Sequence, residues 1–185
     1  RIDLISVSGH NIFGPKGVGA LVARRRGYDR PPLSPLMLGG GQERGLRPGT
    51  LPVALIAGLG EAARLAVSDH GPRLARCRAI RDDLLTSFSE LEYWANGDQD
   101  RVVPHVINIS VSGVDAEAAI VATRDLVAIS NGSACTSSSY EPSHVLTAMR
   151  LERERVDGAL RISWSHMTPD VDWGAVVDRL AALCR

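Results

Sequence analysis

The segment SGHNIFGPK, residues 8–16, combines two glycines with a proline and lies between two short apolar runs. Glycine and proline interrupt regular secondary structure, so this segment predicts a turn. The runs on either side, residues 3–8 and 17–23, have the length and composition of largely buried strands in the interior of a sheet. We therefore expect two strands flanking this turn, within an α/β fold.

Downstream of this turn, the sequence predicts a long loop and two helices. Residues 31–49 have the composition of a loop. Thr50 and Pro52 predict a helix start, because threonine can cap free backbone amides and proline fits a first turn. That helix is expected to end near Ser68, and a second one to begin near residue 71. Apolar residues recur in the second helix every three or four positions, which predicts one buried face formed by Leu74, Cys77, Ile80, Leu84, Phe88 and Leu91.

The remaining sequence alternates between strand and helix signals. Residues 107–111 alternate apolar and polar side chains, which predicts a half-buried strand. We also expect strands at 126–130 and 159–165, helices at about 115–124 and from Pro142, and a last helix capped by Thr168-Pro169. A change in composition at residues 69–72 marks the best boundary between two domains, residues 1–70 and 71–185.

The composition excludes several classes of protein. The 185 residues carry 21 Lys+Arg against 21 Asp+Glu, and a protein that tracks nucleic-acid phosphates would be more basic. No apolar stretch approaches the roughly 20 residues that span a bilayer, so we expect no membrane contact. Among the 21 basic residues Lys16 is the one lysine. Chemistry that needs a lysine amine therefore has one candidate.

The cysteines and histidines form no metal-binding or disulfide pattern. Cys77, Cys135 and Cys184 are an odd number without a C-x-x-C motif, and the five histidines lack metal-ligand spacing. We expect no metal site, and a reducing cytoplasm as the location. Cys77 and Cys184 fall on apolar helix faces, where a buried structural thiol is expected. Cys135 lies in a small polar loop before a helix whose amides favour a thiolate, which suggests a reactive thiol.

Four segments stand out in order along the chain. They are SGHNIFGPKGVGAL (8–21), GGGQERGLRPGTLP (39–52), NGSACTS (131–137) and LRIS (160–163). Together they resemble signatures of the cysteine desulfurases, which are pyridoxal-phosphate (PLP) enzymes of the class V aminotransferase group, in the subgroup with a long active-site loop. The resemblance implies the type I fold of PLP-dependent transferases. Residues 1–70 would be the end of the large PLP-binding domain, and residues 71–185 the small C-terminal domain that carries the catalytic-cysteine loop.

The resemblance also implies roles for individual residues. Ser8 and His10 would contact the cofactor, and Thr50 would reach the PLP phosphate of the partner subunit in a homodimer. Cys135 would take sulfur from L-cysteine as a persulfide and release alanine. Arg161 would pair with the substrate carboxylate through two hydrogen bonds. The persulfide would pass to a sulfur-acceptor protein, for iron–sulfur clusters or other thiolated products.

The sequence departs from the family pattern in two ways. Asn11 occupies the position of the Schiff-base lysine, and a carboxamide cannot attach PLP covalently, while Lys16 matches a separate turn segment. The resemblance also begins about midway through the usual enzyme, so the chain alone is expected to be an inactive C-terminal fragment. Two alternatives stay open. One is a degenerate PLP-fold scaffold that binds sulfur-transfer proteins, and the other is a class V relative that acts on selenocysteine or another amino acid.

Overall fold

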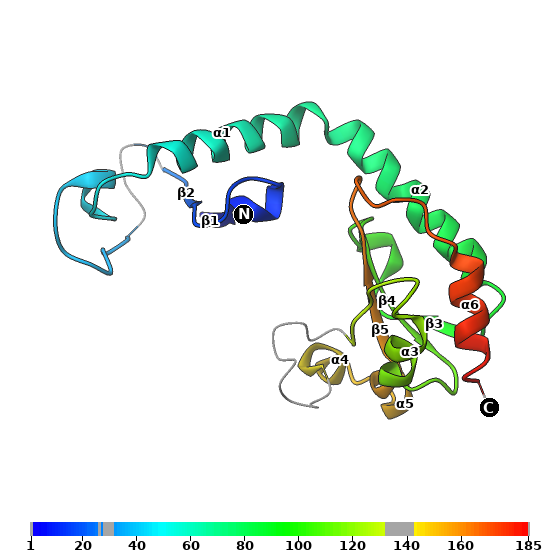
Figure 1. Cartoon of the computed structure of the whole chain (residues 1–185). Helices are drawn as coiled ribbons and strands as arrows, with labels where there is room; N and C mark the ends of the chain where they lie inside the picture. The colour runs from blue at the N-terminus through cyan, green and yellow to red at the C-terminus, as the bar shows by residue number, and fades with distance from the viewer. Residues whose placement is uncertain (1, 26, 28–31, 132–142, 185) are drawn as a thin grey trace. The chain divides into compact units, whose positions relative to one another are not determined.

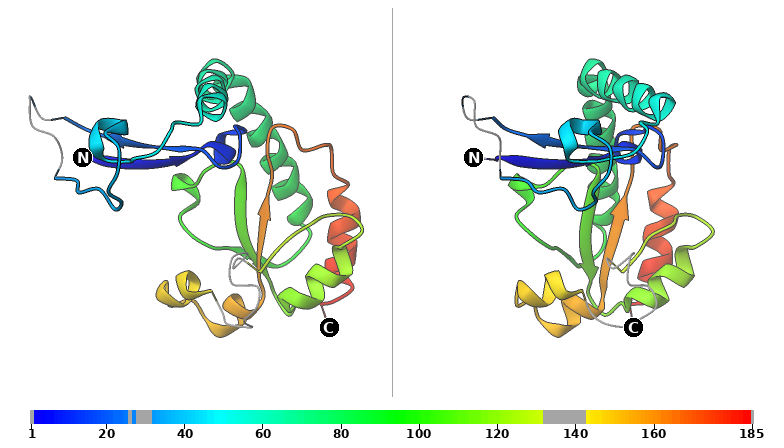
Figure 2. Two further views of the ribbon diagram at one scale, coloured as in Figure 1. Left: turned by 60° about the vertical axis from the view of Figure 1, so that its left-hand side comes forward. Right: turned by 90° about the vertical axis from the view of Figure 1, so that its left-hand side faces the viewer.

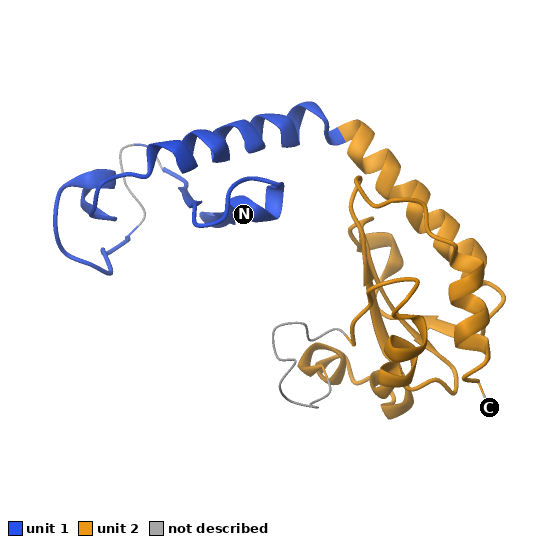
Figure 3. Ribbon diagram, viewed as in Figure 1, with its two compact units in different colours: residues 1–70 blue, residues 71–185 orange. Residues whose placement is uncertain are grey.

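The chain divides into two compact units, residues 1–70 and residues 71–185, which Figure 3 colours separately. Each unit has its own antiparallel sheet in the described residues, two-stranded in unit 1 and three-stranded in unit 2 (Figure 1). None of the helices in these residues has the length and hydropathy needed to span a bilayer. The computed structural model describes residues 2–25, 27, 32–131 and 143–184.

Unit 1 is built on a β-hairpin followed by a long helix. Its elements, in chain order, are β1 (Leu4–Ser8), the 3₁₀ helix η1 (Gly9–Ile12), β2 (Gly19–Ala23), the 3₁₀ helix η2 (Gln42–Gly45) and α1 (Val53–Ser68). β1 and β2 pair from Leu4 opposite Ala23 to Ser8 opposite Gly19. Both predicted strands are thereby confirmed, and η1 lies in the turn predicted between them.

The hairpin is exposed, so the prediction that its strands are largely buried is wrong for this chain. Leu4 and Ile5 of β1 and Leu21 and Val22 of β2 all keep at least 44% of their surface accessible. The physical reason is that, among the described residues of unit 1, β1 and β2 pair only with each other. A two-stranded ribbon without a neighbouring strand cannot bury both of its faces.

Helix α1 packs closely against the turn that links the two strands. A Cβ atom on Gly58 would lie 2.6 Å from Cγ of Pro15, and one on Gly14 would lie 3.0 Å from Cβ of Ala62. Both glycines therefore permit an approach that larger residues would prevent. This contact fixes the turn against the helix.

The end of α1 matches the prediction, but its start does not. The helix ends at Ser68 as expected, yet it begins at Val53 with Pro52 in the N-cap position and no side-chain cap. Thr50 lies two residues ahead of that position. A capping hydroxyl acts from the N-cap residue itself, so the predicted capping role of Thr50 is wrong.

Unit 2 is a three-stranded sheet with helices around it. The strand order is β3-β4-β5, so β4 pairs with a strand on each side, and Figure 2 shows β4 and β5 side by side. Its elements, in chain order, are α2 (His70–Phe88), β3 (Tyr93–Ala95), the 3₁₀ helix η3 (Gln99–Arg101), β4 (Val106–Val111), α3 (Ala116–Thr123), α4 (His144–Ala148), α5 (Arg153–Asp157), β5 (Ala159–Ser163) and α6 (Trp173–Ala181).

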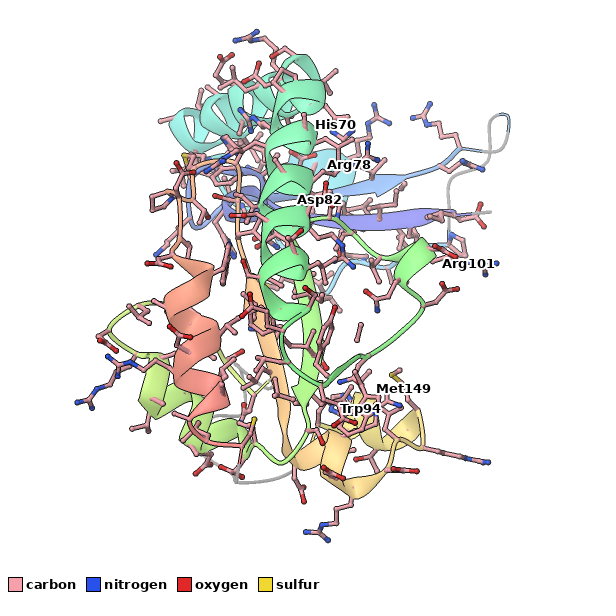
Figure 4. The ribbon with its side chains drawn as sticks, turned by 90° about the vertical axis from the view of Figure 1, so that its right-hand side faces the viewer. His70, Arg78, Asp82, Trp94, Arg101 and Met149 are labelled. Atoms are coloured by element: carbon pink, nitrogen blue, oxygen red, sulfur yellow. The ribbon has the colours of Figure 1, made fainter. Side chains whose placement is uncertain are left out.

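The core of unit 2 lies between the sheet and helices α2, α3 and α6. The predicted apolar face of α2 is confirmed, because Leu84 and Phe88 are fully buried and Leu91 packs against the same cluster. Arg78 and Asp82, labelled in Figure 4, are on the exposed face of this helix. The sheet and the other helices contribute Ile107, Ile109 and Val111 of β4, Leu160 and Ile162 of β5, Ala116 and Ala119 of α3, and Trp173, Val176, Val177 and Leu180 of α6.

Several sequence predictions in unit 2 need correction. Residues 126–130 do not form a strand, because Ser130 alone pairs with β5, in an isolated bridge to Arg161. The last helix begins at Trp173, where the Asp172 carboxylate accepts from the Ala175 amide at 3.0 Å. Thr168 does not cap it, because the Thr168 hydroxyl instead accepts from the Ser165 amide.

Two helix predictions in unit 2 agree with the structure. The helix expected at 115–124 is confirmed as α3, with Asp115 as its cap. The helix expected from Pro142 is α4, which begins at His144, and Pro142 itself lies outside the described residues.

The core accounts for a first testable prediction. Val176→Ala in α6 removes two methyl groups from a side chain that is 1% exposed, and we expect it to lower the free energy of unfolding by about 2 kcal/mol. The matched control is Val121→Ala in α3, where the valine is 62% exposed and the change is expected to be below about 0.5 kcal/mol. Urea denaturation measures both, and equal effects would contradict the described core.

Candidate functional site

Three of the predicted site residues lie together at the end of β1. Ser8 is the last residue of the strand, and His10 and Asn11 belong to η1. Ser8 Oγ lies 2.9 Å from Nδ1 of His10, a hydrogen bond whose donor depends on the histidine tautomer. His10 and Asn11 are exposed and Ser8 is half-buried. The turn therefore presents a hydroxyl, an imidazole and a carboxamide on one short segment.

The backbone of this turn is tightly closed. The Gly9 amide donates to the Val18 carbonyl and the Gly14 amide to the Gly9 carbonyl, both at 2.9 Å. A Cβ on Gly9 would lie 2.8 Å from the Pro15 carbonyl oxygen, so no larger residue fits there without a shift of the backbone. Lys16 is exposed and lies beyond η1, in the turn that leads to β2. Asn11, the residue that the sequence resemblance predicts at the lysine position, lies in η1.

Thr50, the fourth predicted residue of unit 1, is exposed and follows a loop that folds back on itself. The Gly49 amide donates to Oε1 of Gln42 at 3.1 Å, which closes the loop across seven residues. Glu43, Arg44 and Gly45 all have positive φ, of 49°, 60° and 82°. Left-handed backbone costs a residue other than glycine about 1 kcal/mol. The sequence carried no signal for this left-handed turn.

Arg161, the predicted carboxylate-binding residue, lies in the middle of β5. Its strand neighbours Leu160 and Ile162 point into the core, so the Arg161 side chain lies on the opposite face of the sheet, where it is half-buried. The Arg161 amide donates to the Ser130 carbonyl at 2.6 Å, and its carbonyl accepts from the Ser130 amide at 3.1 Å. The backbone that carries this guanidinium is therefore held between β4 and Ser130.

The face of the sheet that carries Arg161 also holds a polar network that the sequence did not reveal. Asn96 is buried, and its side chain hydrogen-bonds Asn108, Ser110 and Arg155. The Arg155 guanidinium lies 5.8 Å from the ring centroid of Trp94, which Figure 4 labels. Asn108 and Ser110 were expected on the solvent side of a half-buried strand, yet Ser110 is fully buried because this network covers it. Their alternation with apolar residues was the available signal.

The three cysteines differ in whether the structure describes them and in whether they are buried. Cys135 lies outside the described residues. Cys77 is buried in the core as predicted, and its burial raises the pKa of the thiol. Cys184 is exposed, so the prediction of a buried thiol is wrong there: α6 ends at Ala181, and Cys184 follows the end of its apolar face.

The residues of unit 1 fit PLP only in part. Hydroxyl and imidazole groups such as those of Ser8 and His10 can bind a phosphate or contact an aromatic ring. Asn11 has no amine to form a covalent bond with an aldehyde, and the exposed Lys16 lies beyond η1, at the other end of the same connection between β1 and β2. The described residues are thus compatible with non-covalent contacts to the cofactor and not with its covalent attachment at residue 11.

Comparisons with known proteins identify the family. Residues 1–172 match the family model described as aminotransferase class-V. The chain is 42% identical over 179 residues to the cysteine desulfurase IscS of Salmonella arizonae, which covers 96% of the chain and 44% of that protein. The crystal structure of DndA from Streptomyces lividans is 47% identical, with a TM-score of 0.73, over 89% of this chain and 47% of that one. The structure of SspA in complex with cysteine is 36% identical, with a TM-score of 0.66, over 88% and 44%.

The chain belongs to the class V aminotransferase family, whose members depend on PLP. Within that family its relatives include cysteine desulfurases, as the four sequence segments indicated. The predicted fold class, the type I fold of PLP-dependent transferases, is confirmed. The chain spans about half the length of the relatives it matches.

The burial of Cys77 gives a second testable prediction. A raised pKa keeps this thiol protonated at neutral pH, and burial blocks reagents, so iodoacetamide should label Cys77 at least about tenfold more slowly than Cys184. Mass spectrometry of the labelled peptides measures both rates. In urea the labelling rates of Cys77 and Cys184 should become similar. Cys184→Ser should abolish labelling of the peptide that contains residue 184. Equal rates in the folded protein would contradict the described burial.

Proposed function

We propose that this chain forms part of a PLP-dependent cysteine desulfurase, an enzyme that moves sulfur from L-cysteine to an acceptor protein. The observation that carries the proposal is the 42% identity to a cysteine desulfurase over 96% of the chain. The SspA relative, whose structure contains cysteine, supports the choice of substrate. The position of Arg161 on a polar face of the sheet agrees with a role in binding a carboxylate.

In this proposal each residue does what its chemistry allows. Arg161 binds the carboxylate of L-cysteine, because a planar guanidinium can donate two parallel hydrogen bonds to a planar anion. PLP, when bound, withdraws electrons from the substrate. The Cys135 thiolate attacks the substrate sulfur and forms a sulfur–sulfur bond as the carbon–sulfur bond breaks. The sulfur stays on Cys135 as a persulfide, and the carbon keeps the electron pair of the broken bond, takes up a proton and leaves as alanine.

Cofactor contacts are assigned to Ser8 and His10, and to Thr50 across a homodimer. Ser8 and His10 share one closed turn and lie within hydrogen-bonding distance of each other, which supports a joint role. The exposure of Thr50 supports a contact with a second subunit. We place the enzyme in the cytoplasm, with L-cysteine and a sulfur-acceptor protein as its partners.

Asn11 favours a second candidate function. A chain that cannot attach PLP covalently is expected to be inactive by itself, so it could serve as a scaffold that binds sulfur-transfer proteins. Retention of both Cys135 and Arg161 favours the enzyme, since a scaffold has no chemical need for a thiol and a guanidinium at these positions. A class V enzyme acting on selenocysteine or another amino acid is the third candidate, which relative rates with cysteine and selenocysteine would distinguish.

A third prediction concerns attachment of the cofactor. In the full-length protein with PLP, borohydride should leave no cofactor on the native peptide that contains residue 11, whereas Asn11→Lys should carry one cofactor there. Peptide mass spectrometry reads out both. Lys16→Arg is the matched control and should change neither result. Cofactor fixed on Lys16 in the native protein would contradict the assignment of Asn11 to the attachment position.

A fourth prediction concerns the chemistry. In the Asn11→Lys background, alanine should form from L-cysteine, and Cys135→Ser should lower that rate by at least about 100-fold because a hydroxyl cannot accept the sulfur. Cys184→Ser serves as the control and should leave the rate within about twofold. Alanine formation that persists in Cys135→Ser would refute the assignment of Cys135 as the nucleophile. A folded Asn11→Lys protein without any activity would favour the scaffold.

A further inference from the structure

The polar face of the unit 2 sheet places Asn108 directly beside Arg161. The two residues are opposite each other in the register of β4 and β5. The amide and carbonyl of Arg161 both bond to Ser130, so they point away from β4. Asn108 and Arg161 therefore form a non-hydrogen-bonded pair, the kind of antiparallel pair in which opposing side chains come closest.

The Asn108 side chain is itself held by Asn96. Asn96 Nδ2 donates to Oδ1 of Asn108 at 2.7 Å and to Oγ of Ser110 at 2.8 Å. Asn96 Oδ1 accepts from Nη2 of Arg155 at 2.7 Å and from Nε at 3.3 Å. A carboxamide can donate two hydrogen bonds and accept two, so Asn96 has every position filled. Its rotamer is fixed from three sides, and it fixes Asn108 in turn.

Arg161 has a fixed backbone and a long side chain. β4 and Ser130 hold the strand on both edges, so the guanidinium is carried on a stem of several single bonds that begins at a fixed point. An ordered carboxamide next to that stem restricts the rotamers it can adopt. Precise positioning matters for a two-point hydrogen bond to a carboxylate, which is lost when the guanidinium plane tilts.

We propose that Asn108, held by Asn96, is a positioning residue that orients the Arg161 guanidinium toward the carboxylate of the amino-acid substrate. The proposal rests on the proposed function, in which Arg161 binds that carboxylate. Asn108 acts through Arg161 and does not touch the reacting sulfur. Loss of Asn108 weakens binding of amino acids with a carboxylate and spares ligands without one.

The test compares Asn108→Ala with Ser110→Ala in the full-length, PLP-loaded protein. Both changes remove one hydrogen bond from the same Asn96 amide, but Ser110 lies opposite Ala159 and not opposite Arg161. Titration calorimetry gives the dissociation constants of L-alanine, which has the carboxylate, and L-alaninamide, which lacks it. Asn108→Ala should raise the dissociation constant of L-alanine about tenfold and change that of L-alaninamide by less than about twofold. Ser110→Ala should change both dissociation constants by less than about twofold.

A third variant covers the case in which Asn108→Ala fails to fold. Asn108→Asp keeps an oxygen acceptor for Asn96 and adds a negative charge beside Arg161, so it should compete with the ligand and weaken L-alanine by more than about tenfold. The inference is overturned if Asn108→Asp binds L-alanine like the native protein, or if both ligands weaken equally in Asn108→Ala.

Arg161→Ala separates the inference from the proposed function. If Arg161→Ala leaves L-alanine binding unchanged, the carboxylate site itself is wrong and both claims fail. If Arg161→Ala weakens binding and the Asn108 variants behave like Ser110→Ala, the positioning role alone is refuted.

Discussion

The pairing of β4 with a strand on each side is the constraint on which unit 2 depends. Side chains alternate across a strand, so β4 sends Ile107 and Ile109 into the core and Asn108 and Ser110 to the opposite face. A register shift of one residue would exchange the two sets and bury polar groups among apolar ones. The packing of the core therefore determines on which face of the unit 2 sheet the Arg161 side chain lies.

The sequence predicts the parts of the fold whose signals are local. The buried face of α2 is visible because its helical period of apolar residues spans several turns. Residues 126–130 look like a strand, yet a strand needs a partner along its length, and only Ser130 finds one. The β1–β2 hairpin has buried-strand composition, but composition does not say what covers a strand within the same chain.

The candidate site also has one part that the sequence predicts and one part that it does not. The turn around Ser8 and His10 could be predicted because its glycines and proline are adjacent in sequence. The network around Asn96 could not, because its partner Arg155 lies 59 residues away and alternation on β4 looks the same whether the polar face meets water or a network. Asn11 can be read from the sequence directly, and its place at the lysine position of the family stays a prediction.

The central claim is that Cys135 is the sulfur acceptor of a cysteine desulfurase. The most direct measurement is the mass of the peptide that contains residue 135, after the full-length Asn11→Lys protein has been incubated with PLP and L-cysteine without an acceptor. The account predicts one additional sulfur atom on Cys135, removable by a thiol reductant. Sulfur found instead on Cys77 or Cys184, or on no cysteine of a protein that has bound PLP covalently, would contradict it.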